Sequence, residues 1–386
     1  MSLPFIDLQA QRKRIEREVN AAILSVVESG RYVLGPEVTE LEKQLAAWCG
    51  AKHSVSCANG TDAIALPLMA WEVGPGDAVF CPSFTFVATA QVVPWTGASP
   101  VFVDILPETY NMDPASLEAA IARVKAEGKL TPKVVIAVDL FGQPANYPAI
   151  KAICDREGLK LISDNAQGFG CTLNGKATTD WADIATTSFF PAKPLGCYGD
   201  GGAVVTNDDR LAELVEALRV YGKVTPTDAA ERNFHHDPKY LSLRVGMNSR
   251  LDTIQAAILL EKLKIFADEI ELRQKVAARY TEGLKGHVRR VPHIIEGGKS
   301  VWAQYVIEHE NRDGLQAHLG TQGIPTAVYY PVPIHMQDFA ADWAPPAGSM
   351  PVTEEASRYV IALPMHPYLS EEDQDRIIDA IRAFNG

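Results

Sequence analysis

The chain has 386 residues, of which 47% are hydrophobic, so it is long enough to bury a large core and to form two domains. Its 36 basic and 48 acidic side chains give a formal net charge of −12, which argues against nucleic acid or an anionic membrane as the main partner. The first residues lack the basic-then-apolar pattern of a secretion signal, and no apolar run is long enough to span a bilayer. We therefore expect a cytoplasmic protein.

The N-terminal part, residues 1–34, predicts an arm with one amphipathic helix, because its apolar side chains recur at helical spacing up to Gly30 and Gly35. A second helix is expected over 37–48, followed by a short strand over 54–57.

Strands and helices then alternate. The strand candidates are 78–83, 100–104, 133–141, 160–164, 183–189 and 203–206. The helical segments between them are 60–71, 86–96, 114–127, 147–157 and 208–221. This alternation predicts a large α/β domain over 35–260, with a mostly parallel sheet flanked by helices.

A long helical pattern from Leu251 to Leu284 is expected to connect this domain to a smaller C-terminal α+β domain. The smaller domain is predicted from a strand over 300–309, a helix over 311–322, a strand over 324–330 and a helix from Ser370 to Ile381. The expected division is therefore 1–34, 35–260 and 261–386.

Several familiar motifs fail on inspection. The run Gly297-Gly298-Lys299-Ser300 resembles the end of a phosphate-binding P-loop, but His293 stands where that motif requires glycine. Dinucleotide fingerprints that start at Gly199 or Gly168 fail at Val204 and Leu173. The six cysteines form no CxxC pair, and His235-His236-Asp237 lacks a third ligand at suitable spacing, so we expect no metal site.

Lys193 stands out because prolines flank it on an irregular turn after the strand 183–189, and a cluster of glycines follows. Sites in α/β proteins form at such strand ends. A lysine removed from water loses its proton easily and becomes a nucleophile, so Lys193 is a candidate Schiff-base former. The alternative is an incidental lysine on a surface turn.

Other strand ends carry complementary groups. Asn59-Gly60-Thr61 opens a helix and offers free N–H groups to an anion, although simple N-capping explains it equally well. Asp164 ends a strand, Ser188 precedes Lys193, and the rings in Ser83-Phe84-Thr85-Phe86 could stack on a planar ligand or pack in the core. Together these groups supply the contacts that pyridoxal phosphate needs.

The chain resembles the DegT-type nucleotide-sugar aminotransferases over nearly its whole length. The motifs that carry the resemblance are Asn59-Gly60-Thr61, Pro82-Ser83-Phe84-Thr85-Phe86, Asp164-Asn165-Ala166-Gln167, the run from Phe189 to Gly196 and the run from Gly246 to Ala257. The resemblance implies fold type I of the pyridoxal phosphate enzymes, acting as a homodimer with active sites shared between the subunits.

Carried over position by position, the resemblance makes Lys193 the Schiff-base lysine. It makes Asp164 the partner of the pyridine nitrogen, Gln167 the neighbour of the ring hydroxyl and Phe86 the stacking ring. The phosphate contacts that it implies are Gly60, Thr61, Ser188 and, from the neighbouring subunit, Asn248. Its implied substrate residues are Arg250, Tyr329, Tyr330 and His335.

The resemblance also implies the reaction, in which glutamate gives its amino group to a nucleotide-linked keto-sugar. Gln167 and the run Phe190-Pro191-Ala192-Lys193-Pro194 resemble members that act at C3, whereas many members that act at C4 carry a His at the position of Gln167. The implied acceptor is a UDP-2-acetamido-3-keto-hexose or its uronate, with Tyr329 at a position where these members often carry a His. The alternatives are a dTDP-3-keto- or 4-keto-6-deoxysugar aminotransferase, a nicotinamide-dependent sugar oxidoreductase and a non-catalytic sugar-nucleotide-binding protein.

Overall fold

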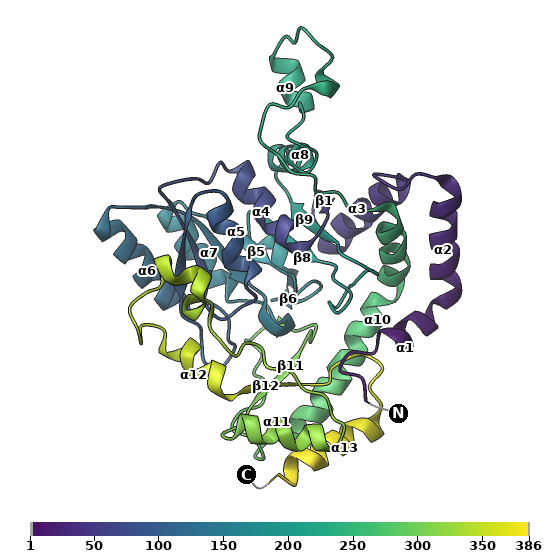
Figure 1. The fold of residues 1–386 in the computed structure, drawn as a ribbon, viewed down its shortest axis with the longest axis vertical. Helices are drawn as coiled ribbons and strands as arrows, with labels where there is room; N and C mark the ends of the chain where they lie inside the picture. The colour runs from purple at the N-terminus through teal and green to yellow at the C-terminus, as the bar shows by residue number, and fades with distance from the viewer. Residues whose placement is uncertain (1–2, 385–386) are drawn as a thin grey trace.

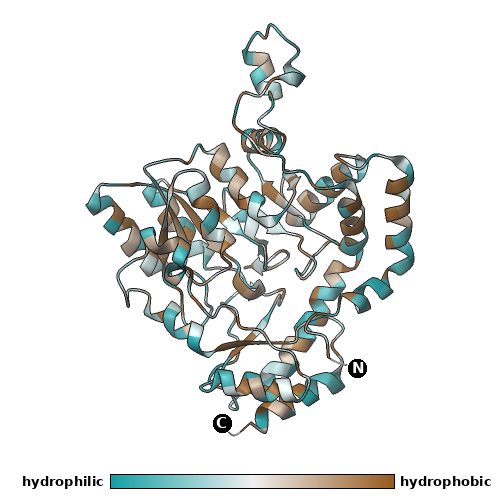
Figure 2. Cartoon of the chain, in the orientation of Figure 1, coloured by the Kyte–Doolittle hydropathy of each residue, from teal (hydrophilic) through white to brown (hydrophobic). Residues whose placement is uncertain are grey.

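The computed structural model describes residues 3–384. Figure 1 shows an α/β body with a group of long helices along one side. A smaller unit, near which both the N- and the C-terminus lie, is at one end of the molecule, and the segment around α9 projects as an arm from the opposite end. Hydrophobic residues follow the central strands, whereas the outer helices carry hydrophilic residues (Figure 2). No helix within residues 3–384 combines the length and apolar character that crossing a bilayer requires.

The body is built on a seven-stranded sheet with strand order β1-β9-β8-β5-β4-β2-β3. Its strands are β1 (His53–Cys57), β2 (Asp77–Pro82), β3 (Ser99–Val103), β4 (Thr131–Val138), β5 (Lys160–Asp164), β8 (Ile184–Ser188) and β9 (Gly202–Thr206). Only β9 runs against the others, since it pairs antiparallel with both β8 and β1. The predicted α/β class and mostly parallel sheet are confirmed, and the carboxyl ends of β1, β2, β5 and β8 share one edge.

Helices cover both faces of this sheet. One face carries α4 (Gly60–Ala70), α5 (Ala88–Trp95) and α8 (Asp209–Leu218), and the other carries α3 (Pro36–Cys49), α6 (Pro114–Glu127), α7 (Tyr147–Glu157) and α10 (Thr253–Leu284). The local sequence fixes their ends: Asp113 accepts hydrogen bonds from Ala115 and Ser116 at the start of α6, and Gly128 ends it at φ 64°.

The N-terminal arm differs from the single helix that the sequence predicts. It forms α1 (Leu8–Arg14) and α2 (Glu16–Ser29), separated at Ile15, whose φ of −122° is not helical. The helical spacing of Ile15, Val19, Ile23 and Val26 nonetheless predicts the packed face, because Val19 and Val26 are fully buried and α2 packs along α10.

The C-terminal unit pairs β11 (Tyr305–Glu308) with β12 (Val360–Leu363) and covers them with α11 (Arg312–Thr321), α12 (Pro351–Tyr359) and α13 (Glu371–Arg382). The strand predicted over 324–330 is wrong, because only Ala327 makes a bridge, to Ala362. β11 is also shorter than the predicted 300–309. β12 has only 4 residues, so it can pair with no more than the segment Tyr305–Glu308, and the residues on either side of β11 have no strand partner.

The remaining elements are short. A small sheet contains β6 (Thr172–Leu173), β7 (Lys176–Ala177) and β10 (Gly298–Lys299). The short 3₁₀-helices are η1 (Leu140–Gly142), η2 (Thr178–Asp180), η3 (Pro238–Tyr240), η4 (Ile334–Met336) and η5 (Asp338–Trp343).

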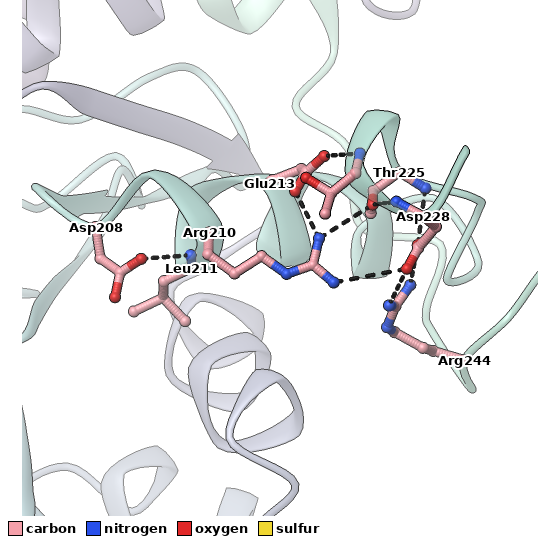
Figure 3. A network of polar contacts seen from close by, with 8 residues as sticks. Asp208, Arg210, Leu211, Glu213, Thr225, Asp228 and Arg244 are labelled. Atoms are coloured by element: carbon pink, nitrogen blue, oxygen red, sulfur yellow. Dashed lines mark hydrogen bonds and ion pairs between the residues drawn. The ribbon is translucent and has the colours of Figure 1, made fainter. Parts of the chain in front are cut away.

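The projecting arm contains α9 (Pro226–Glu231), which is tied to the body by a polar network (Figures 1 and 3). Thr225 and Asp228 form a capping box at the start of α9. Arg244 donates two hydrogen bonds to the buried Asp228 carboxylate, both 2.7 Å long, and Arg210 of α8 lies 3.6 Å from the same carboxylate.

Candidate active site

The candidate site lies at the sheet edge where the parallel strands end. The turn after β1 leads into α4, the turn after β2 leads toward Phe86, β5 ends at Asp164, and β8 ends at Ser188 just before the Lys193 loop. Because these strands run in one direction, their carboxyl ends bring the predicted groups to a single edge. The sequence-based expectation that separate motifs share one site is consistent with this arrangement.

The N-terminus of α4 provides an anion cradle. Asn59 caps the helix by accepting a hydrogen bond of 2.8 Å from the Asp62 N–H. A Cβ atom added to Gly60 would lie 2.5 Å from the Ser188 Cβ atom, so only glycine allows the first turn of α4 to pack directly on the end of β8. This packing brings the free N–H groups and positive dipole end of α4 next to the Ser188 hydroxyl.

A buried hydroxyl beneath the cradle lacks a partner. Thr186 lies two residues before Ser188 on β8, so both side chains face the same side of the sheet. Its Oγ1 atom is buried and makes no hydrogen bond to the described residues. A buried unpaired hydroxyl is unfavourable, so this side of the sheet is suited to a polar ligand.

Asp164 is a buried carboxylate, 3% exposed. It accepts hydrogen bonds from the Thr89 hydroxyl at 3.1 Å and from the Ala166 N–H at 3.0 Å. Burial raises the pKa of Asp164, and these two donors and the charge of Lys193 oppose the rise. A cationic group placed against Asp164 would stabilise its ionised form.

Lys193 has the opposite perturbation. Removal of its amine from water lowers the pKa of Lys193, while the nearby Asp164 carboxylate opposes that change. Its backbone N–H donates a hydrogen bond of 2.8 Å to the Phe190 carbonyl, which holds the turn. The mutual influence of Lys193 and Asp164 places the two predicted groups in one electrostatic environment, where a larger fraction of the amine is neutral and nucleophilic.

Gln167 and Tyr330 form a polar pair at the wall of the site. The Gln167 Oε1 atom accepts a hydrogen bond of 2.8 Å from the Phe141 N–H, and its Nε2 atom donates one of 2.9 Å to the Tyr330 hydroxyl. Burial raises the pKa of Tyr330. The Tyr330 hydroxyl therefore keeps its own proton, which remains available to a ligand. Tyr329 packs against the Tyr330 ring at 5.8 Å.

The remaining predicted residues occupy different environments. Phe86 is 54% exposed, so its ring is accessible for stacking on a planar ligand. Asn248 is exposed and Arg250 is partly exposed. Between them, the backbone N–H of Ser249 donates a hydrogen bond of 2.9 Å to the Arg219 carbonyl, and the Ser249 hydroxyl accepts one of 3.1 Å from the Ala58 N–H. The segment 248–250 therefore lies beside the turn that leads into α4.

His335 does not face an open site. Its ring is buried, its Nδ1 atom lies 2.6 Å from the Ser83 hydroxyl, and its Nε2 atom lies 3.6 Å from Glu354. Burial lowers the pKa of His335, and Glu354 opposes the shift. This packing supports a role in fixing the turn after β2, and it does not support the expected contact with substrate.

Sequence reasoning missed Thr89, which holds Asp164, and the Phe141 N–H, which orients Gln167. A threonine pair four residues apart, Thr85 and Thr89, was a weak signal at the start of a helix. No side-chain pattern can reveal the backbone donor, because every residue except proline carries an N–H.

The fold and these groups define an aminotransferase of fold type I that depends on pyridoxal phosphate. The chain belongs to the DegT/DnrJ/EryC1/StrS aminotransferase family, whose sequence model matches residues 13–382. The predicted family, fold and class of enzyme are thereby confirmed.

Two relatives are similar to this chain along nearly their whole length. The UDP-2-acetamido-2-deoxy-3-oxo-D-glucuronate aminotransferase of Pseudomonas aeruginosa is 50% identical over 368 residues, which cover 95% of this chain and 96% of the relative. The dTDP-3-amino-3,4,6-trideoxy-alpha-D-glucose transaminase of Streptomyces venezuelae is 38% identical, with 99% of this chain and 96% of the relative covered.

Solved structures of aminotransferases have the same fold as this chain. A DegT DnrJ EryC1 StrS aminotransferase from Brucella abortus superposes with a TM-score of 0.94 at 52% identity and full coverage of both chains. The ntda protein of Bacillus subtilis, solved with bound cofactor pmp, superposes with a TM-score of 0.85 at 29% identity, covering 98% of this chain and 84% of that one. Pyridoxal phosphate, in its amine form there, is thus the cofactor of this family, as the sequence predicts.

Proposed function

We propose that this protein transfers the amino group of glutamate to C3 of a nucleotide-linked keto-sugar, a UDP-2-acetamido-3-keto-hexose or its uronate. The observation that carries the proposal is that Lys193, whose pKa is lowered, and Asp164, whose pKa is raised, influence each other's charge at the sheet edge where α4 begins. The relative from P. aeruginosa, named for a 3-oxo-glucuronate, supplies the substrate class. Products of this kind serve glycan synthesis, and we infer that the protein works in the cytoplasm.

The residues present fit the cofactor. The N–H groups at Gly60 and Thr61 and the hydroxyl of Ser188 would bind its phosphate. Asp164 would accept a hydrogen bond from the protonated ring nitrogen, Phe86 would stack on the ring, and Gln167 would lie beside the ring hydroxyl. When bound, pyridoxal phosphate supplies a carbonyl that takes up and returns the amino group and a ring that accepts electrons.

This chain's own residues perform the proton transfers. Asp164, which accepts hydrogen bonds from Thr89 and the Ala166 N–H, would be ionised against the cationic ring of the bound cofactor and would keep a proton on the ring nitrogen. The Lys193 Nζ atom would take up the proton that leaves the amine-bearing carbon and later give it back, acting first as base and then as acid. The lowered pKa of Lys193 suits both roles, because the neutral amine is accessible nearer neutral pH. Tyr330, fixed by Gln167, presents a hydroxyl to the sugar.

We also propose that the enzyme is a homodimer in which Asn248 and Arg250 serve the partner's site. The segment between α2 and α3 supports association, because Tyr32, Val33 and Leu34 are 50%, 48% and 41% exposed in succession. Contiguous apolar exposure of this kind is typical of protein interfaces. The division at residues 34 and 260 remains our proposal for the domain boundaries, with α10 crossing the second one.

The test runs the reaction backwards. The protein is offered 2-oxoglutarate with UDP- and dTDP-linked 3-amino and 4-amino sugars, with and without a uronate carboxylate, and glutamate formation is measured. We expect the UDP-linked 3-amino sugars to react fastest. Faster consumption of a 4-amino sugar would refute the C3 assignment. Preference for dTDP would favour the second candidate, a dTDP-keto-6-deoxysugar aminotransferase, which the relative from S. venezuelae supports.

A further inference from the structure

The loop that carries Lys193 rests on helix α10. Backbone hydrogen bonds close the loop just beyond the ends of β8 and β9, since the Phe189 N–H donates to the Gly201 carbonyl and the Cys197 N–H donates to the Phe189 carbonyl, each at 2.7 Å. Two polar side chains of α10, Gln255 and Lys262, form hydrogen bonds with the backbone of this loop.

Lys262 is an unusual group in this position. It is only 1% exposed, its Nζ atom donates a hydrogen bond of 2.6 Å to the Gly196 carbonyl, and the same atom lies 4.5 Å from the centre of the Tyr198 ring. Burial lowers the pKa of Lys262 to about 8, although the Glu269 carboxylate opposes the shift. A buried ammonium is unfavourable unless its contacts compensate, and here they are a loop carbonyl and a ring.

Gln255 makes the adjoining contact. Its Oε1 atom accepts a hydrogen bond of 2.9 Å from the Tyr198 N–H, and a Cβ atom added to Gly199 would lie 3.0 Å from its Nε2 atom. A spacing of seven residues places Gln255, Lys262 and Glu269 on one face of α10. Glu269 accepts hydrogen bonds from Gln11 of α1 and from Tyr368, so the same face of α10 contacts the loop, α1 and the segment just before α13.

The contact at Gly196 reaches Lys193 through the backbone. A Cβ atom added to Gly196 would lie 2.5 Å from the Pro191 carbonyl oxygen and 2.6 Å from that of Phe190, so these residues are in close contact. The Phe190 carbonyl in turn accepts the hydrogen bond of the Lys193 N–H. A displacement of Gly196 therefore moves the turn that holds Lys193.

We propose that Lys262 is a positioning residue for this enzyme: its buried ammonium anchors the Gly196 carbonyl and thereby holds Lys193 in its reactive placement. The inference rests on the proposed function for the catalytic role of Lys193, but the anchoring itself is a property of the protein without cofactor. Gln255 completes the anchor, and Glu269 stabilises the charge from two turns away.

The test compares Lys262→Met, which keeps the apolar stem, with Lys262→Arg, which keeps a cationic donor. Lys264→Met is the matched control, because Lys264 lies on the same helix with a side chain that is 63% exposed. The first measurement is hydrogen exchange at the amides of Lys193, Cys197 and Tyr198 in the cofactor-free protein. We expect exchange about tenfold to about a hundredfold faster in Lys262→Met, from loss of a charge-assisted hydrogen bond, with partial recovery in Lys262→Arg and no change in the control.

The second measurement is steady-state transamination. We expect kcat to fall about tenfold in Lys262→Met while KM for glutamate stays unchanged, because the loop is displaced and the binding groups remain. Loop exchange equal to wild type, or exchange accelerated equally throughout the protein, would overturn the proposal. If Lys262→Met does not fold, Lys262→Gln is judged by the same outcomes. Absence of transamination in the wild type would refute the proposed function alone, since the exchange result needs no activity.

Discussion

Replacing Arg244 with methionine should release the projecting arm without unfolding the body. In the network of Figure 3, Arg244 gives Asp228 two hydrogen bonds of 2.7 Å, and the Asp228 side chain is only 3% exposed. The Arg244 guanidinium lowers the pKa of Asp228 well below its usual range. Methionine retains much of the stem but leaves that carboxylate with the Thr225 N–H and the more distant Arg210.

The size of the effect follows from these contacts. Removal of one partner from a fully buried ion pair costs about 3–5 kcal/mol. The Arg244 side chain is 26% exposed and Arg210 partly compensates, so we expect about 2 kcal/mol, close to the value for hydrogen bonds to charged groups. That free energy corresponds to roughly thirtyfold faster local opening of α9.

Hydrogen exchange at the amides of α9 measures this opening, and thermal unfolding measures the body. The control is Lys239→Met, since the Lys239 side chain is 63% exposed and its ion pair with Asp237 lies on the surface. Because the folded pKa of Asp228 is depressed, the stabilisation is present above the unfolded pKa of about 3.9 and is lost as the pH falls toward the folded value. The difference between wild type and Arg244→Met should shrink accordingly. Unchanged exchange in α9, or an equal loss of stability in the whole protein, would refute the reasoning.

Three further outcomes concern the active site. Lys193→Ala should abolish transamination and the visible absorbance of the lysine-bound cofactor while the circular dichroism of the protein stays native, and full turnover by this variant would eliminate the assignment. Asp164→Asn should still bind cofactor but lower kcat by at least about a hundredfold, since an amide cannot hold the ring nitrogen protonated; rates equal to wild type with glutamate would reject that role. Mixed dimers of inactive Lys193→Ala and inactive Asn248→Ala subunits should recover some activity, because one hybrid site contains both intact residues; a lack of recovery in verified heterodimers would count against shared sites.

Much of the large domain could be predicted because its signals are local. Continuous apolar runs identified β4 and β5, and helical spacing of apolar residues located helices such as α6 and α7. The C-terminal unit was harder. β11 pairs with β12 across a long stretch of sequence, and the run 324–330 has the composition of a strand but lies where only Ala327 finds a partner.

The same distinction applies to the site. Lys193 and Asp164 were identifiable because turn residues and strand ends mark them in the sequence. Thr89, the Phe141 N–H and Lys262 act through contacts between distant segments, and a buried lysine on an otherwise ordinary helix has the same sequence appearance as an exposed one. Their roles depend on packing, which only the folded chain specifies.

The reversed direction of β9 has a consequence for engineering. Every other connection from the carboxyl edge of the sheet continues into a crossover, whereas the chain after β8 turns back at that edge and re-enters beside it, with Ser188 opposite Gly202. The segment between these residues is therefore a loop whose two ends are neighbours in the sheet. Sequences from relatives can be grafted into it at constant length without altering strand order, provided that the graft presents a carbonyl to Lys262 and an N–H to Gln255.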